Sequence, residues 1–151
     1  MHDILVREWM TAALVTAVPE MKLPEALQQM TAHNIRRLLV VENDRLVGIV
    51  TRGDLRGAQP SEATSLSIFE LHYLVSRITL GQIMTRRPVC VTPTTTIYEA
   101  AKIMLERKIS GLPVLEHDQL VGIITESDIF RMVVRSWPEA EAQDKPVLHT
   151  A

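Results

Sequence analysis

The sequence predicts an α+β fold made of two pseudo-symmetric βαββα repeats that pack sheet to sheet, with a helical linker between them. Three observations predict this fold. Adding 74 to a residue number aligns the two halves without a gap, so that Met10-Thr11 matches Met84-Thr85. Each half carries an amphipathic helical pattern followed by two β-prone apolar runs, and each ends in Gly-x-x-Thr-x-x-Asp, at 48–54 and 122–128. A repeat whose hydrophobic face is too small to stand alone buries that face against its neighbour.

The match between the halves sets the expected domain boundaries. It continues through the pairs Val15/Val89, Pro19/Pro93, Met30/Met104, Leu38/Leu112, Asp44/Asp118, Thr51/Thr125 and Asp54/Asp128. We expect a first repeat at 5–58, a helical linker at 59–80 and a second repeat at 81–136. Residues 137–151 are rich in Pro, Glu, Ala and Gln, which predicts a disordered tail.

Local patterns predict the first strand and helix of repeat one. Leu14–Val18 is a short β-prone run that Pro19 ends. Pro24 suits the first turn of a helix, where a missing N–H is tolerated. An apolar stripe then recurs at helical spacing through Leu23, Ala26, Leu27 and Met30.

A hairpin completes the first repeat. Leu38–Val41 and Leu46–Thr51 are apolar and β-rich, and both residues of Asn43-Asp44 between them tolerate a left-handed backbone. Gly48 inside the second run indicates a bulge or the close approach of another backbone. A short helix is expected after Asp54.

The second repeat shows the same order with clearer boundaries. The predicted elements are a strand at Val89–Val91, a helix capped by Thr96–Glu99, strands at Leu112–Leu115 and Leu120–Thr125 around His117-Asp118, and a closing helix at Asp128–Arg135. Residues 1–9 hold Ile4, Leu5, Val6 and Trp9, which predicts a short lead-in helix or turn packed on a neighbouring unit.

The linker is predicted to be a structured helix. Ser67–Glu70 has the capping-box pattern, and an apolar stripe follows through Ile68, Leu71, Leu74, Val75 and Ile78. We expect this helix to pack on the two halves. A surface for a partner protein is the alternative.

Composition narrows the class of protein. The 151 residues include 46% hydrophobic and 23% charged residues, typical of a globular protein, and the net charge of −2 gives no reason to expect a nucleic-acid or membrane partner. A single cysteine, Cys90, excludes an internal disulfide and indicates a reducing compartment. The N-terminus lacks a signal-peptide pattern, so we expect a cytoplasmic protein.

The repeated Gly-x-x-Thr-x-x-Asp motif admits two interpretations. A strand that delivers Thr51 or Thr125, with Asp54 or Asp128 three residues later, can hold the diol of a ribose, and the following helix N-terminus favours a phosphate. The same spacing is also an ordinary helix capping box. The motif alone does not decide between a ribose site and a helix cap, so the sequence around each copy has to be considered.

The order and spacing of these motifs resemble those of a tandem cystathionine-β-synthase (CBS) domain pair, the Bateman module, as in stand-alone bacterial CBS pairs. Ile109-Ser110-Gly111-Leu112-Pro113-Val114 matches the family's segment before the hairpin closely. Ile35-Arg36-Arg37-Leu38-Leu39-Val40 departs from it, with Arg36 in place of a small hydroxyl residue and Leu39 in place of proline. The resemblance covers residues from about 5 to 135.

The resemblance implies a regulatory module that binds an adenosyl ligand (AMP, ADP, ATP or S-adenosylmethionine) in two clefts, each formed by both repeats. When the family's binding positions are transferred to the matching residues of this sequence, the first cleft contains Thr85, Val89, Ile109 and Ser110 together with Thr51 and Asp54. The other uses Thr11, Val15, Ile35 and Arg36 with Thr125 and Asp128. The departure at Arg36 leaves open whether the two clefts bind equally.

Arginine pairs flank both expected clefts. Arg36-Arg37 and Arg86-Arg87 are candidates to neutralise a phosphate, and a solvated loop surface is the alternative for both pairs. The five histidines and Cys90 lack metal-ligand spacing, and no nucleophile or phosphate-loop motif occurs.

We therefore expect a non-enzymatic sensor of adenine nucleotides that requires no cofactor or metal. The alternative is a CBS homodimer that acts as a protein-interaction module and whose clefts no longer bind ligand. The apolar linker helix motivates that alternative.

Overall fold

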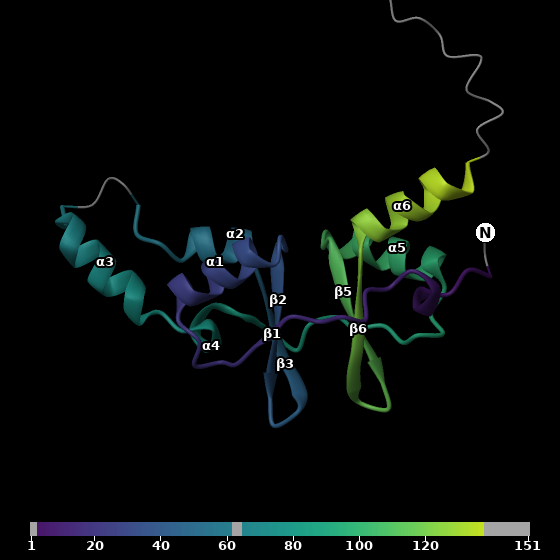
Figure 1. The fold of residues 1–151 in the computed structure, drawn as a ribbon, viewed down its shortest axis with the longest axis horizontal. Helices are drawn as coiled ribbons and strands as arrows, with labels where there is room; N and C mark the ends of the chain where they lie inside the picture. Colours follow the sequence, from purple (N-terminus) through teal and green to yellow (C-terminus); the bar gives the residue numbers. More distant parts are fainter. Residues whose placement is uncertain (1–2, 62–64, 138–151) are drawn as a thin grey trace, which may run out of the picture.

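The computed structural model describes residues 3–61 and 65–137, arranged as two similar halves side by side (Figure 1). In each half a β-hairpin projects on one side of the molecule and two helices lie on the other side (Figure 1). The tail predicted at the C-terminus has only Trp137 among the described residues.

The first half contains a four-stranded mixed sheet. Its strands, in the spatial order β1-β2-β3-β4, are β1 (Thr16–Ala17), β2 (Arg37–Glu42), β3 (Arg45–Thr51) and β4 (Thr85–Arg86). β1 is parallel to β2, and the other pairs are antiparallel. Helices α1 (Leu23–Ala32) and α2 (Arg52–Gly57) complete this half. The predicted order strand, helix, strand, strand, helix is confirmed.

The second half repeats this plan with fewer paired residues. It contains α5 (Ile97–Arg107), β5 (Gly111–Glu116), β6 (Gln119–Thr125) and α6 (Glu126–Ser136). The strand predicted at Val89–Val91 is wrong, because only Val91 pairs, in a single parallel bridge to Val114. Val89 and Cys90, the other two residues of the run, belong to no strand or bridge.

Both hairpin turns have the backbone that their sequences predict. Asn43 and Asp44 have φ angles of 51° and 61°, and His117 and Asp118 have φ angles of 50° and 62°. Two successive positive φ values match the right-handed twist of the flanking strands.

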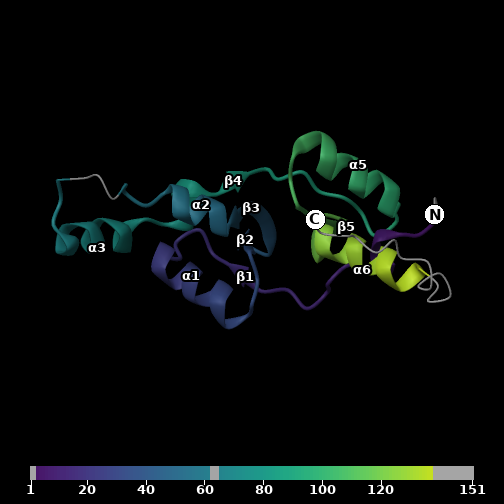
Figure 2. The ribbon, with the colours of Figure 1, turned by 90° about the horizontal axis from the view of Figure 1, so that it is seen from above.

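The halves exchange their leading segments. The 3-10 helix η1 (Val6–Glu8) buries Val6 in the core of the second half, whereas α4 (Leu80–Ile83) buries Leu80 in the core of the first. The prediction that the N-terminal residues pack on a neighbouring unit is confirmed. Figure 2 shows the two crossing segments, purple and teal, on opposite sides of the molecule.

Glycine allows each crossing segment to pass close to the sheet it joins. A Cβ atom on Gly48 would lie 2.5 Å from the Sδ of Met84 and 3.1 Å from the carbonyl oxygen of Thr85. A Cβ atom on Gly122 would lie 2.7 Å from the Sδ of Met10 and 3.1 Å from the carbonyl oxygen of Thr11. The close approach predicted as one alternative at Gly48 is therefore present, and the second repeat has the same approach at Gly122.

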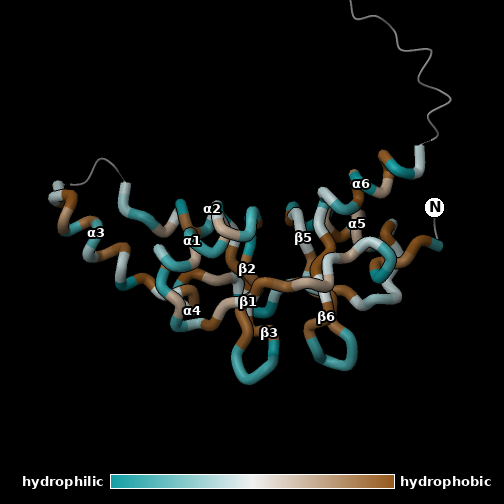
Figure 3. Tube along the Cα trace, viewed as in Figure 1, coloured by the Kyte–Doolittle hydropathy of each residue, from teal (hydrophilic) through white to brown (hydrophobic). Residues whose placement is uncertain are grey.

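Each half has its own hydrophobic core. The long strands are largely hydrophobic and the hairpin turns are hydrophilic (Figure 3). Met30 and Met104, which occupy matching positions on α1 and α5, are both buried in these cores. Full burial of such a side chain contributes about 1.5–3 kcal/mol.

The linker helix α3 (Ile68–Arg77) forms with the predicted Ser67 capping box but packs less than expected. Val75 and Ile78 contact the first core, whereas Ile68 and Leu74 of the same stripe are exposed. Phe69 is also 81% exposed. The helix extends from one end of the molecule (Figure 1), so only its C-terminal end reaches the core. Within the described ranges, no helix has the length and hydrophobicity needed to span a membrane.

Candidate ligand-binding clefts

Both Thr-x-x-Asp motifs form helix caps. Asp54 Oδ2 accepts a 2.8 Å hydrogen bond from the backbone N–H of Thr51, whose Oγ1 accepts a 3.1 Å bond from the N–H of Asp54. Asp128 Oδ2 accepts bonds from the N–H and the hydroxyl of Thr125, at 2.9 Å and 2.8 Å. Capping fixes each carboxylate at the end of its strand and leaves acceptor capacity for a ligand hydroxyl.

The larger cavity, of about 710 Å³, lies between the two repeats. Six residues expected in one cleft line it together: Thr11, Val15, Ile35, Arg36, Thr125 and Asp128. Ala13, Leu14, Leu39 and Ile123 add apolar surface to this wall. The cavity thus offers an apolar wall, a Thr/Asp pair and cationic groups, and its volume is that of a small-molecule site.

The smaller cavity, of about 440 Å³, occupies the place of the second expected cleft. Of the residues expected there, Thr51 and Ser110 line it, and Arg36 and Arg37 join them. The other four expected residues are not in its lining: Asp54, Thr85, Val89 and Ile109.

Those four residues have other positions in the fold. Asp54 caps α2, and Thr85 pairs with Ile49 in the sheet. Val89 is exposed, and Ile109 packs against the second core. The two clefts therefore differ in both size and composition.

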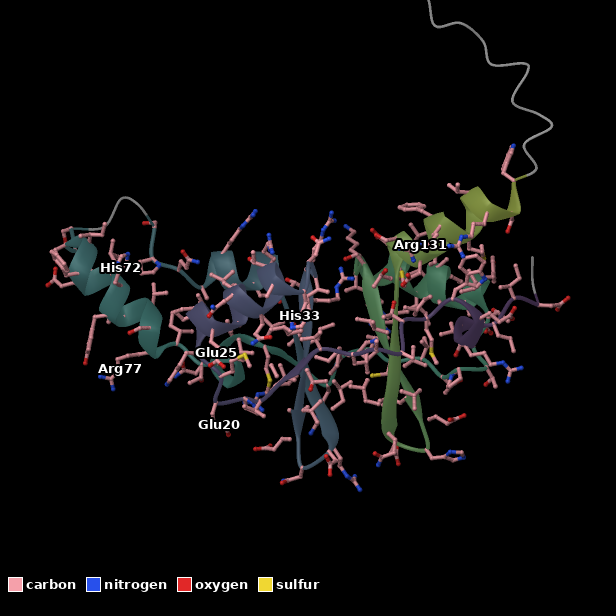
Figure 4. All side chains as sticks on the ribbon, viewed as in Figure 1. Glu20, Glu25, His33, His72, Arg77 and Arg131 are labelled. Carbon is pink, nitrogen blue, oxygen red and sulfur yellow. The ribbon has the colours of Figure 1, made fainter. Side chains whose placement is uncertain are left out.

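Arg131 is a site residue that the motif did not reveal. Its Nη1 donates to Asp128 Oδ1 at 2.7 Å, and Asp128 is only 3% exposed (Arg131 is labelled in Figure 4). The signal was present in the sequence, because an arginine three residues after Asp128 lies on the same face of a helix. The matching position in the first repeat is Gly57, so Asp54 has no such partner.

Arg37 reaches from the first repeat to the second. Its Nη2 donates to the Oγ of Ser110 at 2.5 Å. A Cβ atom on Gly111 would lie 2.7 Å from the Nη1 of Arg37, so the guanidinium rests against the glycine backbone. Burial lowers the pKa of Arg37, and the nearby Glu126 carboxylate opposes that shift. The matching pair Arg37 and Gly111 thus forms one cross-repeat contact.

The other candidate groups lie outside both cavities. Arg86 donates to the carbonyl of Gly81, and Arg87 is exposed with a positive φ angle. Burial raises the pKa of the Cys90 thiol. His33 and His72 lie far apart (Figure 4), and no three His, Cys, Asp or Glu side chains within 3–61 and 65–137 are grouped to hold a metal ion.

The pattern found in the sequence and the fold agree with one known family. The CBS domain matches the chain twice, at residues 6–61 and 80–135. The chain belongs to the CBS domain family. It is a tandem CBS pair with an α+β fold, as its repeats predict.

Relatives of this CBS pair include a protein of almost the same extent. A CBS domain-containing protein of Dictyostelium discoideum is 34% identical over 140 residues, which cover 87% of this chain and 92% of the relative. Inosine-5'-monophosphate dehydrogenase of Korarchaeum cryptofilum is 36% identical over 118 residues, which are 78% of this chain and only 22% of that enzyme. CBS pairs similar to this one thus occur both alone and inside enzymes.

Solved structures of CBS pairs superpose on most of the chain. The Vibrio cholerae protein AcuB is 32% identical, with a TM-score of 0.74 covering 94% of this chain and 98% of that one. CBSX2 in complex with AMP is 27% identical, with a TM-score of 0.72 covering 87% and 97%. The CBS pair of MJ0100 in complex with 5'-methylthioadenosine and S-adenosyl-L-methionine is 27% identical, with a TM-score of 0.73 covering 88% and 98%.

Proposed function

We propose that this CBS pair is a regulatory module that binds an adenosine nucleotide in the larger cavity and acts by binding, without catalysis. One observation carries the proposal: a cavity of about 710 Å³ is lined by all six residues that the family resemblance assigns to one cleft. The complexes of CBSX2 with AMP and of MJ0100 with adenosyl compounds support the class of ligand.

Each part of the cavity suits one part of a nucleotide. The side chains of Val15, Ile35 and Ile123 offer an apolar surface for adenine. Asp128 and Thr125 are positioned to bond the ribose hydroxyls, because the cap holds both at the end of β6. The arginines that line the cavity suit the phosphate, because one guanidinium group can donate two parallel hydrogen bonds to two phosphate oxygens.

Ligand binding acts on the protein by shifting its conformational population. A nucleotide in this cavity contacts β2 and α6, which belong to different repeats, so it stabilises the arrangement in which both surfaces face it. The helices beside the cavity transmit that preference to a partner or a second copy of the chain.

Calorimetry on the full chain tests the proposal with AMP, ADP, ATP and S-adenosylmethionine. The variant Asp128→Asn keeps an amide oxygen for the cap and removes the charge. We expect it to weaken AMP binding by about tenfold or more, the loss typical of a hydrogen bond to a charged group. The matched variant Asp54→Asn should change AMP affinity by less than about twofold, since Asp54 lies outside the larger cavity.

Two results would reject the assignment. One is the absence of binding heat for every adenosyl compound with folded protein. The other is an equal loss of affinity in Asp128→Asn and Asp54→Asn, which would place the ribose elsewhere.

A second candidate function is a homodimeric interaction module. Large apolar side chains are exposed on two helices, with Phe69 on α3 at 81% and Val134 on α6 at 73%. Exposed apolar surface of this kind marks contact sites for proteins. Sedimentation of the full chain tests this function: a monomer at all concentrations contradicts homodimerisation, and a dimer that persists without nucleotide supports it.

A further inference from the structure

The second repeat lacks four arginines that the first repeat places around the clefts. Arg36, Arg37, Arg52 and Arg56 match Ser110, Gly111, Glu126 and Phe130 in the 74-residue alignment. All four arginines line the smaller cavity. Four arginines that the second repeat does not match are therefore gathered at one cavity.

The lining of the smaller cavity is cationic and contains no carboxylate. Thr51, Gly53 and Ser110 are its other members, so no aliphatic or aromatic side chain is available for an adenine ring. The Arg37 guanidinium lies against Gly111 and donates to Ser110, which lines this cavity. This cavity does not suit a nucleoside.

These arginines have few partners of their own. The ion pairs within the described ranges are Lys102–Glu106 and Arg131–Asp128, so none of the four arginines is in one. The side chain of Arg37 donates to the neutral Ser110 hydroxyl. The Nε of Arg52 is buried without a hydrogen-bond partner in the described part of the chain. A buried donor without a partner costs about 1–3 kcal/mol.

The two cavities share one wall. Arg36, Arg37, Arg52 and Ser110 line both of them. Arg56 lines only the smaller cavity, which places it on the far side of this wall from the Thr125–Asp128 pair. A chain of phosphate groups that leaves the larger cavity past the shared wall enters the basic one.

We propose that the smaller cavity is a polyphosphate site, which holds the terminal phosphates of a nucleotide whose nucleoside occupies the larger cavity. This inference rests on the proposed function. The chain accordingly binds one nucleotide, prefers ATP to ADP and ADP to AMP, and discriminates against S-adenosylmethionine, whose sulfonium is positively charged.

Calorimetry in magnesium-free buffer tests the site with AMP, ATP, S-adenosylmethionine and inorganic tripolyphosphate. We expect one ATP per chain, and an ATP affinity about tenfold or more above that of AMP. The variant Arg56→Gln should lower ATP and tripolyphosphate affinity by about tenfold while AMP affinity changes by less than about twofold. Arg56 is exposed, so this variant keeps the core intact. Circular dichroism verifies its fold.

The matched control is Arg86→Gln, which alters an exposed arginine outside both cavities. It should leave the affinity for every compound unchanged. Equal affinities for AMP and ATP, two ATP molecules per chain, or an Arg56→Gln variant that weakens AMP and ATP by the same factor would overturn the polyphosphate site and leave the proposed function standing. Binding of tripolyphosphate that Arg56→Gln abolishes, with no binding of any adenosyl compound, would retain the basic site and reject the nucleoside cavity.

Discussion

The two repeats have the same backbone plan, but they place different side chains at the two clefts between them. Matching methionines fill both cores, and matching glycines admit both crossing segments. At the clefts, Asp128 is buried and paired with Arg131, whereas Asp54 is half-buried and forms no ion pair within residues 3–61 and 65–137. The interior and the crossing points constrain both copies equally. Residues that line the clefts contact solvent or ligand, so their identities can differ between the repeats without disturbing the fold.

Removing a matching core side chain from each repeat gives the largest expected effect. Met30→Ala and Met104→Ala should each lower the free energy of unfolding by about 3 kcal/mol, because each leaves a cavity in a buried cluster. Urea denaturation measures both. Leu105→Ala on the exposed side of α5 is the control and should change stability by less than about 0.5 kcal/mol. A large loss in one methionine variant alone would break the equivalence of the two cores.

Adding a Cβ at the crossing points gives a smaller loss. Gly48→Ala and Gly122→Ala should each cost about 2 kcal/mol, because the new atom meets a methionine sulfur and a threonine carbonyl. Thermal unfolding compares them with Gly57→Ala, whose added Cβ meets no atom within 4 Å. Wild-type stability in both variants would show that the crossing segments shift freely.

The helix caps differ between repeats, and exchanging them sharpens the comparison. Thr96 caps α5 with Glu99, whereas the matching Lys22 makes no side-chain cap on α1 although Glu25 follows at the right spacing. Thr96→Ala should cost about 1 kcal/mol, and Lys22→Thr should stabilise the protein by about 0.5–1 kcal/mol. Urea midpoints measure both changes. Destabilisation by Lys22→Thr would mean that another contact of that lysine outweighs the cap.

The smallest effect is a pH dependence at the α5 cap. Hydrogen bonds from the backbone and hydroxyl of Thr96 lower the pKa of Glu99. A lowered pKa in the folded state gives stability that is present above the ordinary carboxyl pKa and is lost as pH falls through the folded value. The stability difference between wild type and Glu99→Gln should therefore shrink in acid. Urea titrations at neutral and acidic pH measure it, and a constant difference would contradict the capping role of the carboxylate.

Much of the fold could be predicted from the internal repeat and from local sequence patterns. The hairpin turns and the Ser67 cap each depend on a few neighbouring residues, so local patterns identify them. The glycine at position 48 indicates a close approach, but the segment that makes it, Met84-Thr85, is distant in the sequence. The strand predicted at Val89–Val91 was wrong, because the β propensity of a short run does not show whether a distant strand pairs with it, and only Val91 bridges to Val114.

The site was predictable only in part. The residues of the larger cavity follow from motif spacing together with the family resemblance. The path of Arg37 to Ser110 joins positions 73 residues apart and depends on one side-chain conformation, which no local pattern specifies. The exposure of Ile68 and Leu74 on α3 also escaped prediction, because an apolar stripe indicates a face without showing what covers it.

The exchange of leading segments has a consequence for biosynthesis. When residues up to 60 have left the ribosome and later ones have not, the sheet of the first repeat still lacks β4 and its core still lacks Leu80. At that stage Val6 cannot be buried in its core, because other members of that core, such as Leu112 and Ile124, are translated much later. The nascent first repeat is thus an incomplete body with an open sheet edge, and its folding is completed only as the second repeat emerges.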